Sequence, residues 1–188
     1  AILDPRFTMS LPGRMTVSSA MDAMTHAVEA MTSIMANRIC DAQALQAIRL
    51  IAENLPAVVK DSADEEARLN LQIAATLAGW AFTMAQVGLA HAMAHTLGTV
   101  NHLPHGEACG IVLPKVMRYN VDHATAALGQ VSRALGVDTT GMSGREAALA
   151  AADAIEELMR RVGHPTRLRD VGVQEDSLDI AAFDAIAD

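Results

Sequence analysis

The apolar and polar positions repeat at the spacing of a helix along most of the 188-residue chain. Between residues 37 and 53, apolar side chains recur three or four positions apart, the period of a helix with one buried face. No alternation of strand and helix patterns, which would indicate a parallel sheet, is present. The chain therefore reads as a succession of helices.

Seven longer helices are expected, at residues 16–31, 37–53, 67–86, 89–98, 107–119, 123–135 and 143–162. The first should begin near the hydroxyl side chains of residues 16–19, which can cap free backbone N–H groups. Pro56 is expected to interrupt the second helix or to begin a new turn, and the acidic residues at 61–66 to begin the third. Residues 1–15 and 99–106 should be loops, and residues 163–188 a loop with short helices near 166–169 and 178–187.

Composition supports an all-α fold. Apolar residues make up 51% of the chain but aromatic residues only 3%, so Ala, Leu, Met, Val and Ile must build the core. Alanine and methionine favour helices, whereas a β-sandwich or barrel draws on Val, Ile, Thr and aromatic residues. With no internal repeat and no low-complexity linker, residues 1–188 are expected to form a single helical-bundle domain.

The charge and the lack of long apolar segments argue against nucleic-acid and membrane partners, and the cysteines indicate the compartment. The net charge is −8 and no Lys/Arg cluster is present, so a nucleic-acid partner is not expected. No signal peptide and no run of 18 apolar residues is found, so no membrane association is expected either. Cys40 and Cys109 lie far apart and form no CxxC pair. We expect two reduced, buried cysteines in a cytoplasmic protein, and a single disulfide is the alternative.

Histidine is concentrated in one part of the chain. Four of its seven histidines fall within 15 residues: His91, His95, His102 and His105. His91 and His95 are four residues apart and would project from the same helix face. The loop that follows contains Pro104 and Gly106 and can fold back, so that His105 meets the face that bears His91.

A second candidate pair is Asp22 and His26, also four residues apart and surrounded by Ala and Met. A carboxylate in an apolar setting is costly to bury unless it is paired or bound to a metal. Imidazole and carboxylate are ligands for a divalent transition metal with an open coordination position. The alternative is structural, because such histidine pairs often make only hydrogen bonds and Asp22 could be an acid in the first turn of its helix.

Three segments resemble signatures of the iron-containing (group III) alcohol dehydrogenases: residues 12–30, 88–106 and 111–120. The resemblance implies the all-α, C-terminal helical bundle of that family, with a dehydroquinate synthase-like fold. It also implies that the metal ligands are Asp22, His26, His91 and His105. His95 matches a histidine that lies beside the metal and the nicotinamide and relays the substrate proton.

The resemblance further implies an enzyme that interconverts an alcohol and an aldehyde or ketone by hydride transfer with NAD(P), using Fe²⁺. The partners implied are a small-molecule substrate and further copies of the chain in a homo-oligomer. The alternatives are Zn²⁺, as in the related glycerol dehydrogenases, and an isolated, non-catalytic metal-binding module. Thr99 and His102 depart from the usual residues of the family, which leaves the identity of the alcohol open.

The nucleotide-binding half of the family is not expected in this chain. No glycine-rich turn follows a strand pattern, and residues 141–144 read as a loop that caps the next helix. The chain begins at Ala1 in a way that resembles the middle of a protein, so we expect an excised domain that is inactive by itself. Other side chains are expected to be structural: Trp80 and Phe82 in the core, His123 and His164 at the surface or as helix caps, and Cys109 near the site without being a ligand.

Overall fold

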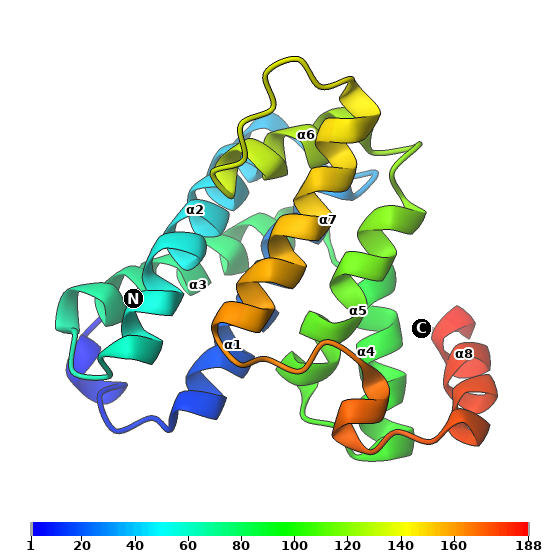
Figure 1. Cartoon of the computed structure of the whole chain (residues 1–188), viewed down its shortest axis with the longest axis horizontal. Helices are drawn as coiled ribbons and strands as arrows, with labels where there is room; N and C mark the ends of the chain where they lie inside the picture. Colours follow the sequence, from blue (N-terminus) through cyan, green and yellow to red (C-terminus); the bar gives the residue numbers. More distant parts are fainter. Residues whose placement is uncertain (1, 188) are drawn as a thin grey trace.

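The computed structural model describes residues 2–187, and the side chains of all of these except Ile180, Phe183, Asp184, Ile186 and Ala187. Within this part, the chain forms α-helices and short 3₁₀ turns and contains no strand (Figure 1). The helices are α1 (Gly13–Thr32), α2 (Arg38–Lys60), α3 (Glu65–Ala85), α4 (Leu89–Asn101), α5 (His105–Tyr119), α6 (Thr125–Ala134), α7 (Gly144–Arg161) and α8 (Leu178–Ala187). The 3₁₀ turns are Pro5–Phe7, Leu168–Val171 and Glu175–Ser177. The prediction of an all-α helical bundle is confirmed.

Helix α1 is the centre of the bundle and packs against α2, α3 and α5. Around it, α2 pairs with α3, α6 with α7, and α4 with α5, while α8 lies against α4. Figure 1 shows α4 and α5 side by side, with α8 beyond them at the edge of the molecule. Because α1 contacts so many neighbours, a polar side chain on it is enclosed by several helices.

Alanine allows these helices to approach closely. The face of α3 that is buried in the bundle repeats alanine at three- and four-residue intervals, at Ala74, Ala78, Ala81 and Ala85. Small side chains at one interface let two helix backbones come near one another, and the larger Met and Ile side chains of α1 and α2 fill the remaining space. The composition-based prediction of an aliphatic, alanine-rich core is confirmed.

Several helix ends differ from those expected. α1 begins at Gly13, directly after Pro12, and not at the hydroxyl-bearing residues 16–19. α2 continues through Pro56 to Lys60, because Leu55 and Val58 on either side of the proline are buried in the core. α4 extends to Asn101, so the loop expected at residues 99–106 shortens to three residues before α5 starts at His105.

Two side chains were placed wrongly by the sequence pattern. Trp80 is 56% exposed, because the alanines on either side of it occupy the buried face of α3. His164 is 4% exposed, since it is enclosed against Gly106 and Gly110 of α5. The exposure of His123 is confirmed, as are the two free, buried cysteines.

In the described part of the chain, no single helix has both the length and the apolar character needed to cross a membrane. One bent pair, Glu65–Ala85 with Leu89–Asn101, meets the length and composition criteria only when its two helices are taken together, and these meet at 106°.

Candidate metal centre

The candidate ligands come from three helices that meet at one point. α1 carries Asp22 and His26, α4 carries His91, and α5 begins with His105. A close contact between α1 and α5 sets this arrangement, because a Cβ atom on Gly106 would lie 2.2 Å from the backbone oxygen of Ser18. Only glycine allows this approach, which brings the neighbouring His105 over Asp22.

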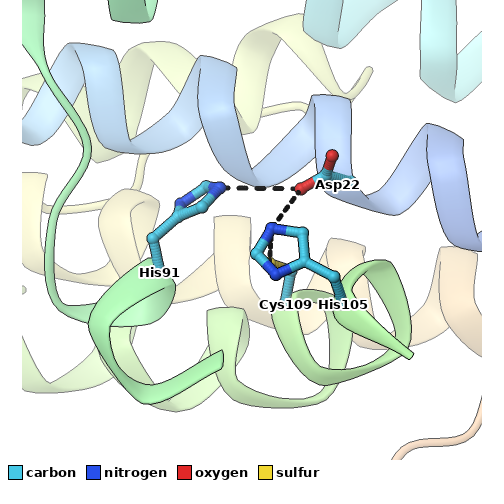
Figure 2. A group of neighbouring side chains, drawn as sticks. All are labelled: Asp22, His91, His105 and Cys109. Carbon is cyan, nitrogen blue, oxygen red and sulfur yellow. Dashed lines mark hydrogen bonds and ion pairs between the residues drawn. The ribbon is translucent and has the colours of Figure 1, made fainter. Parts of the chain in front are cut away.

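One oxygen of Asp22 is the centre of the group (Figure 2). Asp22 Oδ1 lies 3.3 Å from His105 Nε2, 3.5 Å from His91 Nε2 and 3.8 Å from His26 Nδ1. These separations exceed those of good hydrogen bonds. Asp22 Oδ1 and His91 Nε2 are both buried, and neither has a hydrogen-bond partner among the described residues. Buried polar atoms without partners are rare in folded proteins.

The geometry fits a bound divalent metal ion. Two donors at about 2.0–2.1 Å from one tetrahedral metal are separated by roughly 3.4 Å. The distances from Asp22 Oδ1 to His105 and His91 agree with that separation. One carboxylate and several imidazoles also form a donor set that suits zinc or iron. The residues present can therefore hold such an ion.

The charge states of the group support the same interpretation. Burial lowers the pKa of His26 to about 4, and it also lowers the pKa of His105, so both imidazoles keep a free lone pair at neutral pH. Burial would raise the pKa of Asp22, but its contacts with the histidines lower it on balance. The centre is thus a carboxylate faced by neutral imidazoles.

His91 is the exception. Burial by itself would lower its pKa, but polar contacts with Asp22, Cys109 and Glu29 outweigh burial and raise the pKa to about 11. In the metal-free protein, His91 therefore carries a positive charge between two carboxylates. A divalent cation at Nε2 would supply positive charge at the same place, with release of the proton from that nitrogen.

Glu29 is a functional candidate that sequence reasoning missed. It is 3% exposed, and its carboxylate lies 2.6 Å from His91 Nδ1. It also accepts hydrogen bonds from the backbone N–H groups of Gly88 (2.9 Å) and Ala90 (2.6 Å), at the start of α4. With Nδ1 donating to Glu29, Nε2 faces Asp22, and its lone pair becomes available to a metal ion once that nitrogen releases its proton. The spacing of Asp22, His26 and Glu29 along α1, which places them on one face, was the available signal.

His95 lies on the open side of the group. It is exposed, and its ring stacks on that of His105 with 5.4 Å between ring centroids. The side chain of His105 is itself 43% exposed, so solvent and small molecules can reach the group from this side. His102, by contrast, ends α4 in a left-handed conformation (φ 54°) and is not among the donors that the structure brings together.

The structure also adds a sulfur to the group. Asp22, His91, His105 and Cys109 each offer a donor atom, and these four atoms lie within 4.8 Å of one another. His26 stands at the edge of this set, where its ring stacks between Phe82 and His91 at centroid distances of 4.2 and 4.3 Å.

The chain is similar to a family model and to several known proteins along nearly its whole length. The profile described as "Fe-containing alcohol dehydrogenase family, C-terminal" matches residues 16–188. The chain is 42% identical to the 1,3-propanediol dehydrogenase of Citrobacter freundii and 34% identical to the NAD-dependent methanol dehydrogenase of Bacillus methanolicus, in each case over 100% of this chain and 49% of the relative. A crystal structure of a 1,3-propanediol oxidoreductase superposes with a TM-score of 0.96 at 42% identity, over 98% of this chain and 48% of that one. The chain thus spans about half the length of the curated relatives it matches.

Proposed function

Because the chain belongs to the iron-containing alcohol dehydrogenase family, we propose that it is the metal-binding catalytic domain of an enzyme that interconverts an alcohol and an aldehyde or ketone with NAD(P). The observation that carries the proposal is the position of Asp22 Oδ1. This buried oxygen has no hydrogen-bond partner among the described residues, yet the ring nitrogens of three histidines lie 3.3–3.8 Å away.

The proposed ligands are Asp22, His26, His91 and His105, and the proposed ion is Fe²⁺. The family supports iron, whereas nitrogen and oxygen donors alone do not select iron over zinc. Zn²⁺ is therefore the alternative ion. When bound, the ion acts as a Lewis acid that stabilises negative charge on the substrate oxygen.

Around this ion, the residues of the chain have separate tasks. Glu29 holds His91 in one tautomer and one orientation, because His91 Nδ1–H donates a hydrogen bond to the Glu29 carboxylate. His95 stands beside His105 at the exposed side of the group. There it carries the substrate proton between the site and solvent, as a general acid and base.

The nicotinamide cofactor is proposed to bind mainly outside this domain. The described residues contain no strand followed by a glycine-rich turn, the element that cradles a dinucleotide. The name of the Bacillus methanolicus relative supports NAD as the hydride carrier. An N-terminal nucleotide-binding domain is the part of the whole enzyme that would hold the cofactor. We also propose that the protein is a homo-oligomer.

Small aliphatic alcohols are the proposed substrate class, and 1,3-propanediol is the first compound to assay. The support is the 42% identity to a 1,3-propanediol dehydrogenase along the whole chain. The preferred alcohol is identified by measuring activity on a panel that also includes methanol and longer primary alcohols. Each alcohol is tested with NAD and with NADP.

Metal analysis tests the proposal directly. The chain is purified without oxygen, loaded with Fe²⁺ or Zn²⁺, and compared with the variants His105→Ala and His123→Ala. His123 is an exposed histidine outside the cluster, so it is the matched control. We expect about one ion per chain in the wild type and in His123→Ala, and loss of that ion in His105→Ala. A wild type that binds no ion, or a His105→Ala variant that keeps full occupancy, would overturn the proposal.

A further inference from the structure

Cys109 occupies a position that suits a ligand better than a core residue. It lies one helical turn after His105, so both side chains leave the same face of α5. Figure 2 shows the two side chains rising from α5 toward Asp22 on α1. Cys109 is fully buried, and its Sγ lies 3.5 Å from His105 Nε2. Its Sγ also lies within 4.8 Å of the donor atoms of His91 and Asp22.

Hydrogen bonds from the Cys109 thiol cannot satisfy all the polar atoms that surround it. A thiol carries one proton and is a weak donor, so it can serve one of its three polar neighbours. His91 is only 2% exposed, and its Nε2 faces the same point. That nitrogen has no hydrogen-bond partner among the described residues. A cation shared by the sulfur, the imidazoles and the carboxylate would satisfy all of these atoms at once.

The distances agree with a shared cation. A sulfur at about 2.3 Å and a nitrogen at about 2.0 Å from one metal ion are separated by roughly 3.0–3.7 Å, for bond angles between about 90° and about 120°. The observed distance from Cys109 Sγ to His105 Nε2 is 3.5 Å. The four donor atoms of Asp22, His91, His105 and Cys109 also form a compact set, all within 4.8 Å of one another.

We infer that Cys109 Sγ is a ligand of the metal in this protein, so that a thiolate joins the carboxylate and the imidazoles. The inference rests on the proposed metal site. On binding, the thiol loses its proton to solvent and the sulfur donates a lone pair to the ion, with no change of oxidation state. A thiolate is a softer ligand than oxygen or nitrogen, so it raises the affinity for zinc relative to iron.

Cobalt substitution provides a readout that is independent of activity. Co²⁺ bound by a thiolate shows a strong sulfur-to-metal charge-transfer absorption in the near ultraviolet, which an oxygen and nitrogen site lacks. The metal-free chain is titrated with Co²⁺ without oxygen, and the bound cobalt is measured by elemental analysis. The variants are Cys109→Ser and Cys109→Ala. The matched control is Cys40→Ala, because Cys40 is the other fully buried cysteine and contacts Asn37 at the start of α2.

We expect the charge-transfer band in the wild type and in Cys40→Ala, and its loss in both Cys109 variants while cobalt still binds. Cobalt bound to the wild type without the band overturns the inference and leaves the metal site intact. A band that persists in Cys109→Ala, or that disappears in Cys40→Ala, overturns it as well. If elemental analysis finds no cobalt on the wild type, the proposed metal site itself fails. If one Cys109 variant does not fold, the other and the Cys40 control still decide the question.

Discussion

Glu29 on α1 and His91 on α4 are 62 residues apart in sequence, yet the Glu29 carboxylate and His91 Nδ1 lie 2.6 Å apart, with both side chains buried. The same carboxylate accepts hydrogen bonds from two backbone N–H groups at the start of α4. One side chain thus anchors the helix and also orients the imidazole that faces Asp22.

The variant Glu29→Gln should weaken metal binding by about 10–100-fold, the usual effect of losing a carboxylate that orients a ligating histidine. The amide keeps one acceptor oxygen but cannot serve His91 and both N–H groups. Affinity is measured by competition with a chelator. Glu53→Gln, at an exposed position on α2, is the control and should bind as the wild type does. Equal affinities for both variants would show that Glu29 has no role in orienting His91.

The variant His95→Ala should separate catalysis from metal binding. Because His95 is proposed to move a proton and not to bind the ion, metal content should stay near the wild-type value. The kcat of the whole enzyme should fall by about 10²–10⁴-fold, the range for a positioned general acid–base group. Loss of the metal together with activity would instead identify His95 as a ligand.

The variant Gly106→Ala should disrupt the contact between α1 and α5. Its Cβ would lie 2.2 Å from the backbone oxygen of Ser18, and backbone cannot yield as a flexible side chain would. We expect the free energy of unfolding to fall by about 1–3 kcal/mol, as in other overpacked cores, and metal binding to weaken because His105 moves with α5. Denaturant unfolding measures the first effect.

Gly79→Ala is the matched control for this experiment. Gly79 lies inside α3, and a Cβ there would meet nothing within 4 Å. Alanine should raise helix stability at that position by up to about 1 kcal/mol. If both glycine variants changed stability in the same direction, the close contact at Gly106 would not be the cause.

The buried His164 should make stability fall in mild acid. Burial lowers its pKa below the ordinary value of 6.5, so the folded protein keeps it neutral where the unfolded chain takes up a proton. Its contribution is therefore complete above about pH 6.5 and is lost as the pH falls through the pKa of the folded state. In the metal-free protein, His164→Gln should lose less stability between about pH 7 and about pH 5 than the wild type. Parallel curves for the two proteins would contradict this explanation.

The sequence predicted most of the helices, because helical periodicity and alanine content are local properties that tertiary packing only reinforces. Errors occurred where packing overrode a local rule. Pro56 remains inside α2 because its neighbours Leu55 and Val58 are held in the core. Trp80 points outward because small alanines take the buried face of α3, against the usual expectation for a large aromatic side chain.

The residues of the candidate site also fall into two groups, those that the sequence predicted and those that only the packing of the helices brought together. Two pairs, Asp22 with His26 and His91 with His95, follow from four-residue spacing on a helix, and the sequence alone determined them together with the family resemblance. Only the tertiary structure decided that Glu29 reaches His91 and that Cys109 joins the donor group. Those contacts depend on how closely separate helices approach, as at Gly106 and Ser18, and no periodic pattern within one helix contains that distance.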